Sequence, residues 1–112
     1  IVLKSEGKQL FNYTYVSDVV RALLILLKNK NNDIAYNISS DELVSLKDIA
    51  SYIASLNGKN VIFDIPPLTE AQGYSKSLVS SLNCTKFNNE FKFHVDVKLF
   101  DGIKNTIEIL KE

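Results

Sequence analysis

The feature that most constrains this fold is the stretch over residues 9–27, in which a strand pattern runs directly into an apolar helix pattern. Aromatic and polar side chains alternate over residues 11–15, which predicts a strand with one buried face. Ser17 or Asp18 is the predicted N-cap of the helix that follows, because either side chain can accept a hydrogen bond from the first helical N–H groups. The sequence therefore predicts a strand joined directly to a helix.

The helix in this joint is apolar on almost every side. Between Val19 and Leu27, Arg21 is the only polar residue. Such a helix has to be covered over most of its surface, and one small core in a chain of 112 residues covers only part of it. The pattern predicts either the central helix of a compact domain or a helix that also meets a further domain.

Length and composition predict one α/β domain over residues 1–112. Hydrophobic residues make up 46% of the chain, which is enough for a core, and the formal net charge is zero. Nucleic acid and an anionic membrane would each need a basic face, which this charge balance does not favour, so we predict neither partner. The longest apolar run, residues 22–27, is far shorter than the roughly 20 residues that span a bilayer.

Two residue counts bear on the protein's context. The single cysteine, Cys84, excludes an internal disulfide framework and fits a reducing compartment, so we predict a cytoplasmic protein. The sequence contains no methionine and opens on three apolar residues that are typical of a strand interior. Together these features predict a piece of a longer protein.

The remaining elements predict a mixed α/β fold with about three main helices and four to five short strands. Ser45, followed by Asp48, is the predicted cap of a helix over residues 46–56, and Gly58 is its predicted left-handed end. Strands are predicted over residues 1–4, 34–39 and 61–65, and the last two would enclose this helix in a βαβ unit.

The C-terminal third is less regular. Residues 68–80 predict a surface loop, and a short helix is predicted to begin near Asn83. Val95 or Asp96 opens the last predicted helix. Gly102 inside that helix indicates close packing or a tolerated weakness of about 1 kcal/mol relative to alanine.

Three collinear motifs resemble those of a known enzyme family. The first reads roughly G-x-x-x-R-D-[FY]-x-[YH]-V-x-D-[VL]-x-x-[AG] in that family, and the matching residues here are Gly7, Asn12, Tyr13, Tyr15, Val16, Asp18, Val19 and Ala22. The second is a [YF]-N-[IV] segment, matched at residues 36–38. The third, at the tail, is matched by Leu82, Lys86, Phe87, Phe100, Gly102, Ile103, Thr106 and Ile107.

These motifs resemble the NAD-dependent epimerase/dehydratase family, the extended short-chain dehydrogenases that act on nucleotide sugars. The resemblance spans residues 7–110 and implies the C-terminal, substrate-binding lobe of such an enzyme. It implies a nucleotide sugar as the ligand, an N-terminal Rossmann lobe as the missing partner, and NAD(P) as the cofactor of the parent protein; oligomerisation is left open.

The catalytic signatures of that family are absent from this sequence. Its members hold the NAD pyrophosphate in a glycine-rich turn, whereas the four glycines here are scattered. They also use a Tyr-x-x-x-Lys pair, and no tyrosine here has a lysine four residues later. We therefore predict no catalytic residue, no cofactor and no metal for this chain, which would be catalytically silent alone.

The resemblance also places candidate contacts to a substrate diphosphate. Gln9 and Asn12 flank the position of a family arginine, where Phe11 stands here, and their amides could donate to phosphate oxygens. A second family arginine aligns with Ala71, and Lys76 could supply charge from the same loop. Each polar residue has a plainer interpretation as a solvated surface group, and the two missing arginines put ordinary diphosphate binding in question.

Tyrosines and isolated reactive residues complete the set of candidates. Tyr13 and Tyr15 are predicted to line a sugar or base pocket, or to be core residues with satisfied hydroxyl groups. Asp18 is predicted to cap a helix rather than to act in acid–base chemistry. His94 lacks the clustered ligands of a metal site and is predicted to lie at the surface, and Cys84 lacks a histidine partner.

Two rival functions remain open at this point. One is a stand-alone α/β interaction domain whose apolar helix meets a protein partner. The other is the lobe of a related reductase whose substrate is not a nucleotide sugar, which the missing arginines favour.

Overall fold

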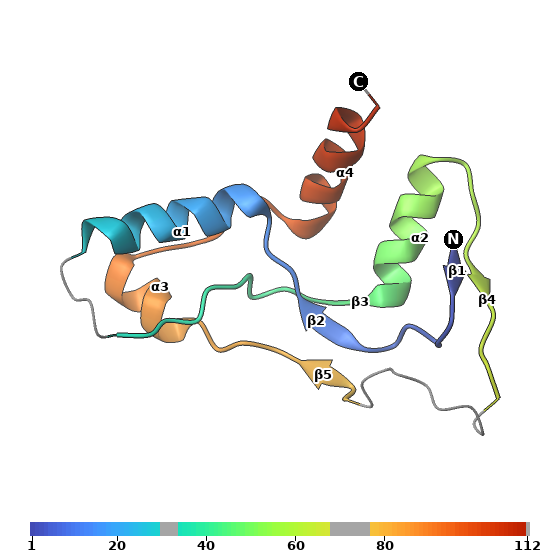
Figure 1. Cartoon of the computed structure of the whole chain (residues 1–112), viewed down its shortest axis with the longest axis horizontal. Coiled ribbons are helices and arrows are strands. Elements are labelled where there is room, and N and C mark those ends of the chain that lie inside the picture. Colours follow the sequence, from blue (N-terminus) through green and yellow to red (C-terminus); the bar gives the residue numbers. More distant parts are fainter. Residues whose placement is uncertain (30–33, 68–76, 112) are drawn as a thin grey trace.

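The computed structural model describes residues 1–29, 34–67 and 77–111, which contain four helices and five short strands (Figure 1). The mixed α/β class is thereby confirmed. In chain order the elements are β1 Val2–Leu3, β2 Leu10–Asn12, α1 Val16–Lys28, β3 Leu43–Ser45, α2 Leu46–Leu56, β4 Ile62–Phe63, β5 Val79–Ser80, α3 Thr85–Phe91 and α4 Leu99–Ile109. The chain is flat and elongated, at 51 × 38 × 18 Å. Its radius of gyration of 17.2 Å exceeds the roughly 13 Å of a compact domain of this length.

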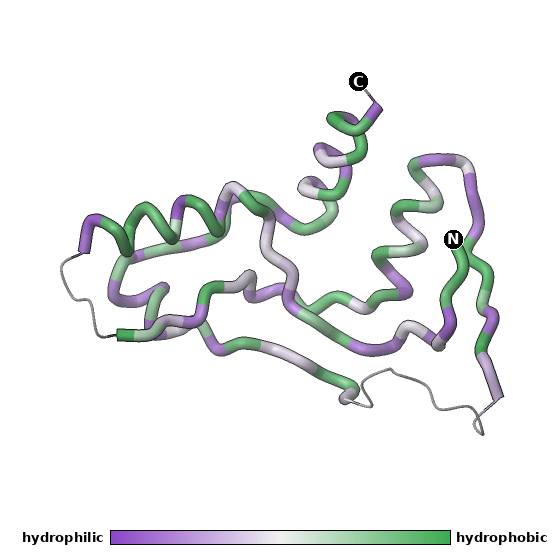
Figure 2. The backbone as a smooth tube through the Cα atoms, in the orientation of Figure 1, coloured by the Kyte–Doolittle hydropathy of each residue, from purple (hydrophilic) through white to green (hydrophobic). Residues whose placement is uncertain are grey.

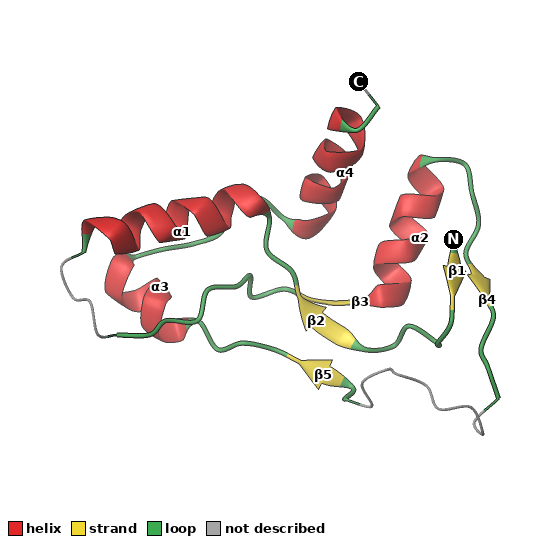
Figure 3. Ribbon diagram, in the orientation of Figure 1, coloured by secondary structure: helices red, strands yellow, loops and turns green. Residues whose placement is uncertain are grey.

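Two small sheets connect the helices (Figure 3). In the larger sheet, β2 lies between β3 and β5, antiparallel to β3 and parallel to β5. The register pairs Phe11 with Val44 on one side and with Ser80 on the other. In the smaller sheet, β1 and β4 run parallel, and Val2 pairs with Ile62. The sequence pattern did not indicate β5, which falls inside the predicted loop.

The predicted strand at residues 34–39 is wrong, and so is the βαβ unit built on it. No strand is present there in the described chain, and α2 lies between strands of different sheets. Within this segment, the Ala35 carbonyl accepts from Lys86 Nζ at 3.4 Å, and Asn37 Nδ2 donates to the Asn83 carbonyl at 3.2 Å. Side chains also hold the residue that follows it: the Ser40 N–H donates to Thr14 Oγ1 at 2.9 Å, and Asn12 Nδ2 donates to the Ser40 carbonyl at 2.9 Å. The strand predicted at 11–15 is shorter in the structure and spans Leu10–Asn12.

The prediction that Ser17 or Asp18 caps α1 is also wrong. The N-cap residue is Tyr15, which has no side-chain capping bond. The Asp18 side chain is 1% exposed, and its two oxygens accept from the N–H groups of Asp96 and Val97, both at 3.1 Å. Because these residues are held by Asp18, α4 begins at Leu99, later than the predicted start at 95 or 96.

The local prediction for α2 is confirmed. Ser45 Oγ accepts from the Asp48 N–H at 3.0 Å, and the helix covers the predicted range. Gly58 ends the helix with φ +59°, and Gly7 in the first turn has φ +66°, both in the left-handed region.

The hydrophobic core lies at the α1–α3 end of the molecule, and Figure 2 shows the many apolar positions along α1. Ala22 and Phe87 are fully buried there, and Phe93 is nearly so. The Phe87 ring meets those of Tyr36, Phe91 and Phe93 at centroid distances of 5.6, 4.9 and 5.1 Å. Leu26, Ile25, Ile38 and Val95 pack around this cluster. The other end of the molecule is more open, and the candidate site lies there.

Candidate functional site

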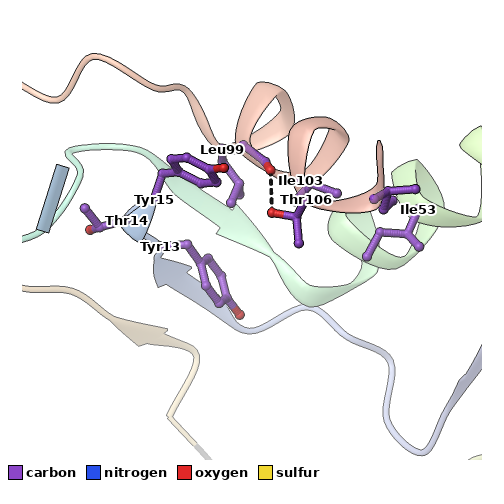
Figure 4. Close-up of a pocket in the computed structure, with 9 residues that line it drawn as sticks. Tyr13, Thr14, Tyr15, Ile53, Leu99, Ile103 and Thr106 are labelled. Carbon is purple, nitrogen blue, oxygen red and sulfur yellow. Dashed lines mark hydrogen bonds between the residues drawn. The ribbon is translucent and has the colours of Figure 1, made fainter. Parts of the chain in front are cut away.

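A pocket of about 310 Å³ opens between the β2–α1 joint and helices α2 and α4 (Figure 4). Figure 4 shows the Tyr13 and Tyr15 rings on one side, with Ile103 and Thr106 of α4 and Ile53 of α2 beyond them. The full lining is Tyr13, Thr14, Tyr15, Ile53, Leu99, Gly102, Ile103, Thr106 and Ile107. Its volume is at the lower end of the range of small-molecule sites, about 300–1,000 Å³.

The walls of this pocket are fixed by close packing between the joint and α4. A Cβ atom on Gly102 would lie 2.6 Å from Cδ2 of Tyr15, so only glycine lets the helix approach the ring this closely. The close-packing interpretation of this glycine is thereby confirmed. Tyr52 of α2 and Phe100 of α4 hold the two helices together, with ring centroids 4.7 Å apart.

The pocket is apolar and carries no charged side chain in its lining. Its two threonine hydroxyls are engaged: Thr106 Oγ1 donates to the Gly102 carbonyl at 2.8 Å, and Thr14 Oγ1 accepts from the Ser40 N–H. The hydroxyl groups of Tyr13 and Tyr15 make no hydrogen bond within the described parts of the chain. Such a lining suits an uncharged ring that stacks on aromatic faces, with phenol groups offering hydrogen bonds.

The predicted site residues do not converge on one pocket. Tyr13 lines the pocket just described, whereas Gln9 lines a separate hollow of about 340 Å³ that is also bordered by Ile65 and Leu78. Lys76 and Ala71 lie outside the described residues. The substrate roles of Gln9, Asn12, Tyr13 and Lys76 therefore stay predictions.

Asn12 ties three segments of the chain together. Its amide nitrogen donates to the carbonyls of Ser40 at 2.9 Å and Glu42 at 3.2 Å, and its amide oxygen accepts from the Leu82 N–H at 2.9 Å. Both amide hydrogens are thus engaged inside the chain, so a phosphate contact would have to replace one of these bonds. Phe11, at the family's arginine position, packs edge-on against Tyr13 with ring centroids 6.1 Å apart.

The reactive residues singled out in the sequence lie away from the pocket. His94 is at the surface, as predicted, with its side chain 82% exposed and Nε2 3.2 Å from an Asp96 oxygen. Cys84 is buried, and burial raises the pKa of its thiol, which disfavours the thiolate needed for nucleophilic chemistry. The described residues contain no cluster of side chains that could hold a metal ion. Nor does any helix in them combine the length and the apolar character needed to cross a membrane.

The described residues also do not fit a dinucleotide. A pyrophosphate needs a glycine-rich turn between a strand and a helix, but β3 joins α2 directly at Ser45 and Leu46. Gly7 precedes β2 and packs against the Lys47 backbone, since an added Cβ would lie 2.9 Å from the Lys47 nitrogen. No step of a reaction through NAD is therefore assigned to these residues.

Sequence reasoning missed the pocket walls contributed by the helices. The α4 residues in the lining have the apolar helical spacing that predicts a core face: Leu99, Ile103 and Ile107. Ile53 belongs to a similar apolar face of α2. Periodicity identifies such a face but does not show whether another element fills the space in front of it. The close contact between Gly102 and Tyr15 places α4, with its apolar residues, against the β2–α1 joint. The spacing of residues in the sequence does not show this contact.

The chain is similar in sequence and in fold to parts of several known enzymes. No protein-family model matches the chain. A UDP-N-acetyl-alpha-D-glucosaminuronate decarboxylase from Bacillus cytotoxicus is 28% identical over 114 residues, which cover 100% of this chain and 36% of the relative. Among solved structures, a dTDP-glucose 4,6-dehydratase from Bacillus anthracis in complex with NAD superposes with a TM-score of 0.81 at 18% identity, covering 98% of this chain and 34% of that one.

A second solved structure has higher sequence identity. The UDP-glucuronic acid 4-epimerase from Bacillus cereus, in complex with UDP-glucuronic acid and NAD, matches with a TM-score of 0.73 at 25% identity, over 92% of this chain and 32% of that one. The resemblance to the NAD-dependent epimerase/dehydratase family is confirmed. The chain spans about a third of the length of the extended short-chain dehydrogenases that it matches.

Proposed function

We propose that this chain is the substrate-binding part of an NAD-dependent nucleotide-sugar epimerase or dehydratase. The observation that carries the proposal is the aromatic pocket at Tyr13 and Tyr15, because the segment that forms its wall also carries the first family motif. The relatives named above act on nucleotide sugars, and two of the proteins are described as binding NAD. NAD binding and catalysis would belong to an N-terminal lobe of the parent protein.

In this proposal the pocket holds an uncharged ring of the substrate, either the base or the sugar. Tyrosine faces stack on such rings, and the apolar walls from α2 and α4 exclude water around them. The diphosphate would receive less support than in an arginine-containing site, since Phe11 packs on Tyr13 where the family has a guanidinium. Affinity should therefore come mainly from the ring contacts and depend only weakly on salt.

Ligand binding by the purified chain tests the proposal. UDP-glucuronic acid is the first ligand to try, because one similar structure contains it and a second relative is named for a UDP-linked uronate. Saturation-transfer NMR should detect weak binding, with a Kd near the millimolar range (about −4 kcal/mol). NAD alone should give no signal. The isolated chain should also turn over no substrate, and measurable epimerase activity would contradict that part of the proposal.

Variants locate the binding to the pocket. Tyr13→Ala should weaken binding of UDP-glucuronic acid about tenfold, because it removes one aromatic wall. Ile62→Ala is the matched control, since Ile62 lies on β4, is 59% exposed and is not part of the pocket lining. Equal binding of UDP-glucuronic acid by the two variants would mean that this pocket is not the binding site.

The rival function as an interaction domain draws support from a different observation. Helix α1 exposes apolar side chains along its length, including Leu23 at 50% and Leu27 at 80% exposure. An interaction domain would bind neither nucleotide sugar nor NAD, so the same NMR experiment separates the two functions. A reductase lobe with another substrate would likewise give no signal with a nucleotide sugar, but its parent protein would still require a dinucleotide.

A further inference from the structure

The end of α2 carries the single Asn-Gly pair of this chain, Asn57–Gly58. Both residues are exposed, and Figure 1 shows the chain leaving α2 here and turning back towards β4. Asn57 is the C-cap of the helix, and Gly58 follows it with φ +59°. A Cβ added to Gly58 would meet nothing within 4 Å, so no neighbouring side chain shields the pair from solvent.

Two backbone hydrogen bonds hold this turn. The Lys59 N–H donates to the Ala54 carbonyl at 2.8 Å, and the Gly58 N–H donates to the Ser55 carbonyl at 3.3 Å. This is the Schellman pattern, in which a left-handed residue lets the chain reverse and satisfy the last carbonyls of a helix. The geometry of the turn therefore depends on the exact number of backbone atoms between Asn57 and Lys59.

The Asn57 side chain adds a third bond to the same turn. Its Nδ2 donates to the Ile53 carbonyl at 2.9 Å, one of the four carbonyls at a helix end that lack an ordinary intrahelical partner. The last turn of α2 contains no basic residue that could serve instead. Because the Ile53 side chain lines the aromatic pocket, the Asn57 amide supports the helix end that forms one wall of that pocket.

The residue types in this pair permit a covalent change that needs no enzyme. The Gly58 nitrogen loses its proton and attacks Cγ of Asn57; a C–N bond forms, the Cγ–Nδ2 bond breaks, and the amide nitrogen leaves as ammonia. Water then opens the resulting succinimide. Cleavage at Cγ leaves aspartate, and cleavage at the backbone carbonyl carbon leaves isoaspartate. Glycine favours the first step because it has no Cβ to obstruct its nitrogen.

We propose that Asn57 is a site of spontaneous deamidation in the folded protein and that its conversion loosens the last turn of α2. At the Asn57 ψ of 11°, the Gly58 nitrogen points away from the Asn57 side chain, so the turn has to open before attack. The longer of the two backbone bonds holds that nitrogen, and helix ends open more readily than helix interiors. The inference does not depend on the proposed function.

Conversion reverses the effect of this side chain on the helix. An aspartate at position 57 places a carboxylate against the Ile53 carbonyl, to which the amide donated, and adds negative charge at the negative pole of α2. Isoaspartate also adds one carbon atom to the backbone before Gly58, which breaks the spacing of the Schellman bonds. Hydrogen exchange in the turn should therefore accelerate in the converted protein.

Incubation of the full-length gene product in mildly alkaline buffer tests the site. Asn60 is the matched control, because it is exposed in the same connection but is followed by Val61, whose branched side chain obstructs attack. Trypsin cleaves after Lys59, so mass spectrometry follows the two asparagines in separate peptides, and a zero-time sample corrects for conversion during digestion. Asn57 should convert faster than Asn60 by about tenfold or more.

Two variants separate the chemistry from its structural effect. Gly58→Ala should slow conversion of Asn57 about tenfold, because its Cβ obstructs the attacking nitrogen without meeting another part of the fold. Asn57→Asp reproduces one product and provides its chromatographic standard. In this variant, hydrogen exchange at the Lys59 amide should accelerate about threefold, whereas exchange at the Asp48 amide, near the start of α2, should not change.

Three results would overturn the proposal. The first is native conversion of Asn57 that is no faster than that of Asn60. The second is conversion that occurs only in urea, because the site would then belong to the unfolded chain. The third is unchanged exchange at the Lys59 amide in Asn57→Asp, because the Asn57 amide would then not support the end of α2.

Discussion

Helices α1 and α2 are similar in length and amphipathic character but are stabilised in different ways. Helix α2 is capped within its own sequence by Ser45 and Asp48, and it turns polar residues such as Ser51 to solvent. Helix α1 has no side-chain cap, and its only acid reaches a segment 78 residues away. Local sequence thus encodes α2, whereas α1 depends on tertiary contacts and leaves one apolar face exposed.

The largest effect should follow from emptying the core beneath α1. Phe87→Ala removes a fully buried ring that meets three other aromatic rings, so it should lower the free energy of unfolding by about 4 kcal/mol. Urea unfolding followed by far-UV circular dichroism measures this loss. Phe63→Ala is the matched control, because Phe63 is 44% exposed and should cost far less. A loss as small as that of the control would mean that the α1–α3 cluster is not the stabilising core.

A second substitution removes the long-range anchor of α1. Asp18→Asn replaces a buried carboxylate that accepts two backbone N–H groups and pairs with Arg21, so it should cost about 3 kcal/mol. Hydrogen exchange at the Asp96 and Val97 amides should also accelerate. The same change at Asp48 in α2 should cost well under 1 kcal/mol, and equal costs at the two sites would contradict the contrast between the helices.

A smaller effect tests the local encoding of α2. Ser45→Ala removes the side-chain oxygen that accepts from the Asp48 N–H, so the free energy of unfolding should fall by about 1 kcal/mol. Ser51→Ala, in the exposed middle of the same helix, should be neutral or slightly stabilising because alanine is the better helix former. If Ser45→Ala cost nothing, α2 would depend on tertiary packing as α1 does.

The sequence was most informative where structure is locally determined. The cap at Ser45, the left-handed Gly58 and the range of α2 could all be predicted, since each depends on neighbours within a few residues. Tyr13 lines a pocket, which was one of its two interpretations from the sequence, and its role toward a substrate stays a prediction. The tail motif included Gly102, but its close contact with Tyr15 is visible only in the structure.

Errors arose where a distant segment decides the outcome. Asp18 has the residue type and position of a cap, but two backbone N–H groups far along the chain bind its carboxylate instead. Residues 34–39 have the composition of a strand, but no strand forms there, and the segment instead contacts Asn83 and Lys86 through the Asn37 side chain and the Ala35 carbonyl. Nothing in the spacing of these residues reports such long-range partners.

The smallest effect concerns Cys84, the buried residue that precedes α3. Burial raises the pKa of its thiol above the ordinary value of about 8.5, with a further contribution from the charge of Asp41, while a backbone hydrogen bond from Ser39 acts in the opposite direction. The folded protein therefore holds this proton more tightly than the unfolded chain. Its contribution to stability is complete below about pH 8.5 and declines as the pH rises through the folded pKa.

Comparison with Cys84→Ala isolates this contribution, because tyrosines and lysines titrate in the same alkaline range in both proteins. The difference in the free energy of unfolding between the two proteins should be constant from pH 6 to about 8 and should shrink above about 8.5. A difference that stays constant to pH 10 would mean that the thiol has an ordinary, solvated environment. The segment that leads into α3 would then be more solvated than the burial of Cys84 indicates, and the contrast with the solvated outer face of α2 would weaken.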